Sequence, residues 1–345
     1  MKNRIDLSNY QIRTDLIIEN INPRLYNNNI NIEVINNDLK VTTIYVSKEL
    51  EKEFQKKEGN YITIEFTDIT NHEDQEEINK VLESEIKKLL NKLNIKEDAS
   101  CLVIGLGNSN STADSLGPKT INKVLVTRHL FELNTNVKEG IRSVAAISPG
   151  VMANTGIETY DIITSLVDKI EPNFLIVIDS LASSSIDRIN KTIQLTDFGI
   201  HPGSGVGNNR KEISQDTIGI PVIALGVPTV VESTIIVNDT INYLFKHLFY
   251  IKNNQEMNKL IIKHNKNYLD NIGDKDLSKD EKREVSGILG ELDENSKIEL
   301  INEVLNSLDY NLIVTPKEID FLIDNLSKVI SSSINKALSS AITEQ

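Results

Sequence analysis

Four continuous apolar runs in the middle of the chain constrain the fold more than any other feature of the sequence. The runs occupy residues 101–106, 144–147, 174–178 and 221–225. Helical periodicity lies between or after them at residues 116–130, 157–170 and 237–250. Buried strands that alternate with helices are typical of a mostly parallel sheet with helices on both faces. We therefore predict an α/β fold for residues 100–250.

The segments on either side of this region follow other patterns. Short stretches of alternating apolar and polar residues predict antiparallel strands of an edge or flap at residues 31–34, 41–46 and 61–66. A helix is predicted at residues 76–93, where apolar side chains recur every three or four residues. After residue 251 the chain is charged and rich in Asn, with helical periodicity at residues 280–289, 296–308 and 318–338. We expect this last part to be a helical extension packed on the core.

Composition and charge exclude several classes of protein. The chain has 37 basic and 50 acidic residues and a formal net charge of −13, and its Lys and Arg residues form no basic run, so we expect no direct binding to nucleic acid. The one cysteine, Cys101, cannot form an internal disulfide. No apolar run approaches the roughly 18 residues of a membrane helix, and the first fifteen residues lack the apolar centre of a signal peptide. The expected compartment is a reducing cytoplasm, with no membrane partner.

Two aspartates lie where parallel strands are predicted to end, and this is the edge at which open α/β sheets bind ligands. Asp179 directly follows the run FLIVI, and Asp114 lies in the loop between the run CLVI and a helix that opens near Leu116. Two carboxyls at one edge can share a proton, so that one activates water while the other polarises a carbonyl. The alternatives are an N-cap for Asp114 and a loop anchor for Asp179.

Other motifs favour other kinds of site. GLGN at residues 105–108 begins like a dinucleotide-binding loop but lacks the third glycine of that pattern. HPGSGVGNNR at residues 201–210 is suited either to an anion or a peptide, or to a tight loop at a subunit contact. No HExxH pattern occurs, so a metal site would require Asp114 and Asp179 together with a histidine such as His201.

Several longer segments resemble the germination protease family, the endopeptidases that degrade small acid-soluble spore proteins. The matching segments are YQIRTDLIIEN (10–20), GLGN (105–108), DSLGP (114–118), VTRHL (126–130), PGVMANTGIET (149–159), IDSLA (178–182), TIQLTDFGIHPGSGVGNNR (192–210) and GVPTVV (226–231). They follow the order of the family over about residues 10–231, so the resemblance is far more specific than one short motif.

The resemblance implies an atypical aspartic endopeptidase whose two catalytic aspartates are Asp114 and Asp179. It also implies a fold similar to that of hydrogenase maturation proteases, no metal or other cofactor, and a homotetrameric zymogen of the developing spore and spore core that removes its own leader. The bond between Asp15 and Leu16 is the candidate processing site. Residues 1–15 are then a propeptide, residues 16–250 the catalytic domain and residues 251–345 the helical extension.

The resemblance also points to residues that shape the site or an interface. They are Gly107, Asn108, His201, Gly203, Gly205, Asn208 and Arg210. Ser183 and Ser184 depart from the family, which usually has Ala-Arg there, and Asp197-Phe198-Gly199 stands where the family tends to have Asp-Thr-Gly. Three other functions stay open: a metal-dependent maturation-type protease of the same fold, a nonenzymatic binder of anions or nucleotides, and a structural spore protein without activity.

Overall fold

The computed structural model describes residues 14–21, 29–133, 136–203, 210–253, 275–307 and 312–342. These residues belong to two compact units. The sheet unit comprises the described residues up to 230 together with residues 315–342, and the helical unit comprises those between 231 and 314. None of the described helices is long and apolar enough to cross a membrane.

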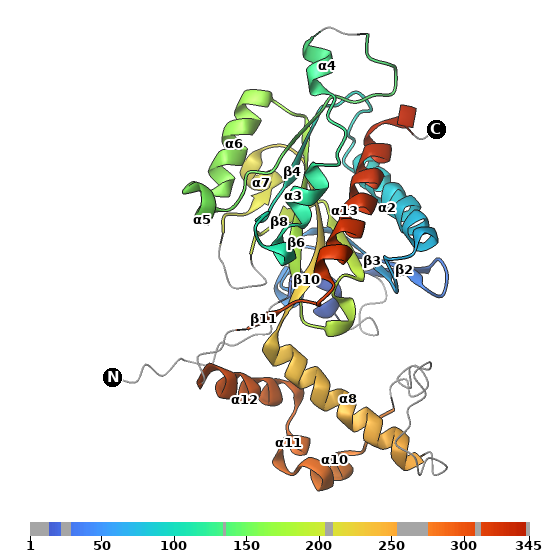
Figure 1. The fold of residues 1–345 in the computed structure, drawn as a ribbon, viewed down its shortest axis with the longest axis vertical. Helices are drawn as coiled ribbons and strands as arrows, with labels where there is room; N and C mark the ends of the chain where they lie inside the picture. The colour runs from blue at the N-terminus through green and yellow to red at the C-terminus, as the bar shows by residue number, and fades with distance from the viewer. Residues whose placement is uncertain are drawn as a thin grey trace. The chain divides into compact units, whose positions relative to one another are not determined.

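The sheet unit is built on a mixed sheet (Figure 1). Its strands lie side by side in the order β1 (Ile30–Val34), β2 (Leu39–Val46), β3 (Gly59–Phe66), β7 (Thr192–Thr196), β10 (Val222–Glu232), β6 (Phe174–Ser183), β4 (Cys101–Gly105) and β5 (Val144–Ile147). Strand β4 runs parallel to both β5 and β6, whereas β1, β2, β3, β7 and β10 form successive antiparallel pairs. The predicted α/β sheet is confirmed, and the N-terminal strands predicted as an edge or flap join it through β7.

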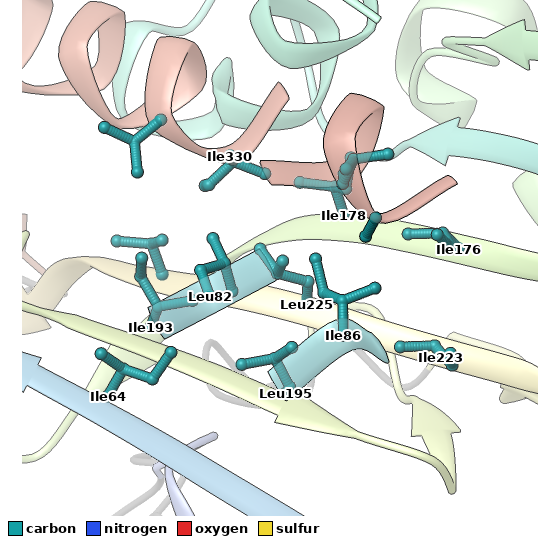
Figure 2. Packing of buried hydrophobic residues seen from close by; sticks show 14 of the residues in the cluster. Ile64, Leu82, Ile86, Ile176, Ile178, Ile193, Leu195, Ile223, Leu225 and Ile330 are labelled. Carbon is teal, nitrogen blue, oxygen red and sulfur yellow. The ribbon is translucent and has the colours of Figure 1, made fainter. Parts of the chain in front are cut away.

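Helices cover both faces of this sheet, as predicted (Figure 1). Helices α2 (His72–Lys92), α3 (Leu116–Ile121) and α13 (Ile319–Leu338) share one apolar core with the sheet, and α6 (Thr159–Ile170) and α7 (Gln215–Ile218) pack on the other face. Figure 2 shows the first core, in which Leu82 and Ile86 of α2 and Ile330 of α13 meet isoleucine and leucine side chains of the strands.

The prediction of one helix over residues 116–130 is wrong, because this segment forms α3 and a separate short helix, α4 (Arg128–Glu132). Thr127 explains the interruption. Its N–H donates to the carbonyl of Val144 at 2.9 Å, and its hydroxyl donates to the carbonyl of Arg142 at 2.5 Å and accepts from the Val144 N–H at 2.9 Å. These bonds tie Thr127 to Arg142 and to Val144 at the start of β5, and its backbone, with φ −128° and ψ −13°, is not helical.

The remaining elements are short or belong to the helical unit. Those of the sheet unit are α1 (Glu51–Phe54), α5 (Met152–Thr155), β8 (Gly199–Ile200) and β9 (Ile213–Ser214). Those of the helical unit are α8 (Ser233–Asn253), α10 (Lys279–Ser286), α11 (Ile288–Glu291), α12 (Glu294–Ser307) and β11 (Ile313–Val314), with α12 packed on α8. The helical stretches predicted after residue 251 are thus α10, α12 and α13. Residue 250 lies inside α8, and α13 belongs to the sheet unit.

The start of α2 depends on a side-chain cap. Asn71 is extended, and its side-chain oxygen accepts a hydrogen bond of 3.0 Å from the Glu73 N–H. Replacing Asn71 with Ala is expected to lower the free energy of unfolding by about 1 kcal/mol, because this N–H then loses its partner. Urea unfolding measures the change. Two other variants are expected to lower the free energy of unfolding less: Asn71→Ser, which keeps a side-chain acceptor, and Asn91→Ala, at an exposed position inside the helix. An equal loss of stability in all three variants would contradict the cap.

Candidate active site

Strand β6 carries Asp179 past the end of its neighbour β4. The last residue pair between these strands is Gly105 with Ile178, so Asp179 is the first residue of β6 beyond the paired part. The sequence interpretation placed Asp179 after its strand, but β6 continues to Ser183. The carboxyl therefore starts from rigid backbone and is buried, with the residue 5% exposed. The Ser180 N–H donates to its Oδ1 at 2.9 Å.

Asp114 reaches the same edge from the loop between β4 and α3. It is the last residue of a short 3₁₀ helix, Thr112–Asp114, and Leu116 opens α3 two residues later, as predicted. Gly117 lets α3 lie against the end of β4, because a Cβ there would come within 2.2 Å of the Leu106 carbonyl oxygen. Gly107 has φ +106°, and a Cβ there would lie 2.1 Å from the Asp114 carbonyl oxygen. Two glycines therefore fix the loop that presents Asp114.

The environment of the two carboxyls favours their protonated forms. Burial raises the pKa of Asp114 to about 6, opposed by a hydrogen bond from the Asn108 backbone. Burial raises the pKa of Asp179 well above its usual range, and the negative charges of Asp114 and then Asp15 raise it further, against the Ser180 N–H. Two such groups favour holding a proton between them near neutral pH. One acid and one base are then available at the same edge.

The segment of residues 14–21 lies along the last part of β6. The Asp15 N–H donates to the Ala182 carbonyl at 3.1 Å, and the Ala182 N–H donates to Oδ2 of Asp15 at 2.8 Å. Leu16 and Ile17 are fully buried, and Ile17 belongs to an apolar cluster with residues of β2, β3 and α1. The bond between Asp15 and Leu16 is therefore held beside the strand that carries Asp179.

Ser183 and Ser184 anchor this same segment. The carboxylate of Glu19 accepts hydrogen bonds from the Ser184 N–H at 2.7 Å, the Ser184 hydroxyl at 2.8 Å and the Ser183 hydroxyl at 2.5 Å. Arg188 lies 3.5 Å from the same carboxylate. Ser183 and Ser184 thus fix the chain four residues after Asp15.

The other predicted site residues divide into two groups. Gly107 and Asn108 contact the Asp114 loop directly, since the Asn108 N–H donates to the Asp114 carbonyl at 2.9 Å. Gly203 is in a turn with φ +72°, and Arg210 pairs with the carboxylate of Glu158 at 3.2 Å and not with that of Asp114 or Asp179. Gly205 and Asn208 lie outside the described residues.

His201 is not brought to the two aspartates. Its Nε2 atom lies 2.6 Å from the Glu212 carboxylate, and its ring stacks with Phe198. Within the described ranges, no three His, Cys, Asp or Glu side chains are grouped as metal ligands. The ligand set considered from the sequence, with Asp114, Asp179 and His201 together, is therefore not assembled.

Sequence reasoning missed three residues near the site. The side chain of Asn154 in α5 donates to Oδ1 of Asn108 at 3.0 Å and so ties α5 to the Asp114 loop. Lys56, just after α1, and Gln194, in β7, both donate to the main-chain carbonyl of Asp15. Asn154 and Gln194 lie in segments that resemble the family, but Lys56 comes from a charged turn that carries no such signal.

Comparison with known proteins identifies the family. The family model described as germination protease matches residues 20–345. The chain belongs to the germination protease family. The germination protease of Bacillus velezensis is 43% identical to it, over 99% of this chain and 97% of its own length. That of Bacillus subtilis is 42% identical, over 100% of this chain and 98% of its own length. The germination protease of Priestia megaterium is 42% identical, over 100% of this chain and 98% of its own. This germination protease family member is therefore a peptidase.

One solved structure is also similar. It is a NiFe hydrogenase maturation protease, HycI, from Thermococcus kodakarensis KOD1, with 16% sequence identity and a TM-score of 0.26. The similarity covers 41% of this chain and 80% of that chain.

Proposed function

We propose that this germination protease is an aspartic-type endopeptidase whose catalytic pair is Asp114 and Asp179. The observation that carries the proposal is the buried Asp179 carboxyl, whose pKa is raised by burial and by the charge of Asp114. One carboxylate takes a proton from water, and the other, protonated, carboxyl donates to the scissile carbonyl or to the leaving amine. Two rigidly held carboxyls that together keep one proton are suited to this reaction, in which either one acts as the base and the other as the acid.

We further propose that the chain is made as a zymogen and cleaves its own Asp15–Leu16 bond. Residues 1–15 are the propeptide in this proposal. The docking of Asp15 on Ala182 supports it, because the segment occupies the free side of β6 just beyond Asp179. A substrate that binds there as an added strand would have to displace the same residues. The propeptide therefore obstructs the site until it is cut.

The proposed substrates are small acid-soluble spore proteins, and the proposed setting is a homotetramer in the developing spore and the spore core. Flexible proteins present extended segments, and the path of residues 14–17 along β6 is the path that such a segment would take. The net charge of −13 fits an enzyme that acts on DNA-binding proteins without itself binding DNA.

The test compares wild type with Asp114→Asn and Asp179→Asn by intact mass. Purified full-length proteins are incubated at mildly acidic and neutral pH, alone and with a small acid-soluble spore protein. The matched control is Asp216→Asn, because Asp216 is an exposed aspartate in α7. We expect wild type and the control to lose residues 1–15 and to cut the substrate, and each site variant to do neither while staying folded.

Other outcomes count against specific parts of the proposal. A site variant that keeps wild-type activity shows that its aspartate is a cap or loop anchor. Loss of wild-type activity on addition of a chelator favours the metal-dependent alternative. If the wild type loses its leader at another bond, the Asp15–Leu16 assignment is wrong while the catalytic pair stands.

A further inference from the structure

The carbonyl oxygen of Asp15 accepts two side-chain hydrogen bonds. The Lys56 ammonium donates to it at 2.9 Å, and the Gln194 side-chain amide donates at 3.0 Å. In the proposed function this carbonyl belongs to the bond that is hydrolysed. Both donors are thus already hydrogen-bonded to the oxygen that becomes negative, and an oxyanion hole needs its donors about 2.7–3.1 Å from the position that this oxygen then takes.

Gln194 holds the chain on both sides of the Asp15–Leu16 bond. Its Nε2 donates to the carbonyl before the bond, and its Oε1 accepts the Ile17 N–H at 2.8 Å. The Ile17 N–H requires an acceptor, so it fixes the orientation of the amide and directs the NH₂ group at the Asp15 oxygen. Because Gln194 lies in β7, paired with both β3 and β10, its position is set by rigid backbone.

Lys56 places a positive charge at the same oxygen. Its Nζ atom also lies 3.3 Å from the Thr14 carbonyl, so the ammonium faces main-chain oxygens, and among the described residues it has no ion pair within 4.0 Å. Burial lowers the pKa of Lys56, and the charges of Asp15 and Glu19 oppose this effect. A cation removed from water interacts more strongly with a developing negative charge than an exposed one does.

We propose that Lys56 and Gln194 form the oxyanion hole of this peptidase. When the water oxygen bonds to the Asp15 carbonyl carbon, the water proton passes to one aspartate and the carbonyl electron pair moves to the oxygen. The Lys56 ammonium and the Gln194 amide hold that oxygen while it is negative. The carbonyl then re-forms, the bond to the Leu16 nitrogen breaks, and this nitrogen takes the proton of the other aspartate.

A role limited to docking the leader is the competing interpretation. The segment on both sides of the Asp15–Leu16 bond already has other anchors, namely the two hydrogen bonds between Asp15 and Ala182, the buried side chains of Leu16 and Ile17, and the bonds of Glu19 to Ser183 and Ser184. An oxyanion hole predicts that removing a donor slows cleavage while the leader stays bound. A docking role predicts that cleavage slows because the leader is released.

The test, which rests on the proposed self-cleavage, measures both quantities in the full-length chain. The rate of leader loss is followed by intact mass, and hydrogen exchange of the Ile17 amide in the uncut chain reports whether the segment that holds the Asp15–Leu16 bond stays docked. Lys56→Met removes the charge and the donors at similar length, and Lys57→Met is the matched control at the exposed neighbouring lysine. Gln194→Glu removes the donor to Asp15 but keeps an acceptor for the Ile17 N–H.

We expect Lys56→Met to slow leader loss about 10²–10³-fold while the Ile17 amide stays protected from exchange. The control Lys57→Met is expected to match wild type, and Lys56→Arg is expected to recover part of the rate. Gln194→Glu is expected to slow leader loss as well, and it provides an independent test if Lys56→Met does not fold. Leader loss at the wild-type rate in Lys56→Met, or slower loss together with free exchange at Ile17, would overturn the oxyanion hole and leave the proposed function intact. A wild type that does not cut the Asp15–Leu16 bond overturns both.

Discussion

Asp179→Asn and Asp114→Asn are each expected to stabilise the protein at pH 8 while lowering the rate of peptide hydrolysis about 10²–10⁴-fold. Both carboxyls are buried enough to favour the neutral form, and Asn is neutral at every pH. For Asp114, a pKa raised from 3.8 to about 6 corresponds to about 3 kcal/mol, which solvent screening of a partly buried group reduces to about 1–2 kcal/mol. We expect a larger gain for Asp179, which is only 5% exposed.

The sign of this effect follows from proton binding. A carboxyl whose pKa is higher in the folded state contributes its stability fully below pH 3.8 and loses it as the pH rises through about 6. Urea unfolding at pH 4 and pH 8 should therefore show a gain for Asp114→Asn over wild type only at pH 8. Asp216→Asn should show no such gain at either pH. A site variant that is less stable than wild type at pH 8 would mean that the ionised carboxylate supports the fold.

The pH dependence of wild-type activity gives a second readout of the same pair. If the two carboxyls must together hold one proton, activity falls both when the pair gains a second proton and when it loses the last one. The initial rate of substrate cleavage from pH 4 to pH 9 should therefore have an acidic and an alkaline limb. A flat profile would count strongly against the shared proton.

Gly107→Ala is expected to cost about 3 kcal/mol of stability and to lower activity at least about 100-fold. The added Cβ would meet the Asp114 carbonyl oxygen at 2.1 Å and Oδ1 of Asp114 at 2.8 Å, in a backbone conformation with φ +106°. Strain and overpacking each cost about 1–3 kcal/mol. The loop must shift to relieve the contact, and a displacement of about 1 Å at a reacting group costs about 100-fold in rate.

Gly219→Ala separates the contact from the backbone strain. Gly219 also has positive φ, at +88°, but it ends α7 and a Cβ there would meet nothing within 4 Å. We expect this control to cost about 1 kcal/mol and to leave activity unchanged. Thermal unfolding and the rate of substrate cleavage are measured for both variants. Equal behaviour of the two would show that Gly107 is required only for its dihedral angles.

The sequence alone could locate the aspartate pair because the apolar runs mark the parallel strands. Runs such as FLIVI are buried on both faces, and the polar residue that ends such a run must lie near the edge of the sheet. The same reasoning misplaced the end of β6, since Ser180, Leu181, Ala182 and Ser183 continue the strand without a continuous apolar pattern. The length of a strand depends on which strands pair with it, and a single sequence does not show this pairing.

The sequence could not predict the groups around Asp15. Strand β7, with the sequence TIQLT, buries Thr192, Gln194 and Thr196, so its polar residues are as inaccessible as its apolar ones. The alternation of polar and apolar residues in this segment therefore did not indicate a strand in the middle of the sheet. Lys56 reaches the site only because β3 pairs with β7, and this pairing joins segments more than 120 residues apart, such as Tyr61 and Thr196. Contacts between residues so far apart in the sequence depend on the order of the strands in the sheet and not on local sequence patterns.

The position of α13 has a consequence for the order in which the protein is made. It is the last α-helix of the described residues to be synthesised, yet Ile323, Leu326, Ile330 and Ile334 belong to the apolar core that α2 and the sheet also form. Until these residues leave the ribosome, apolar side chains of the strands beside them stay open to water. Strand β6, which carries Asp179, and the loop that carries Asp114 are thus synthesised long before α13 can cover the sheet. Nascent chains of this protein pass through a stage in which the sheet is exposed to chaperones and to aggregation.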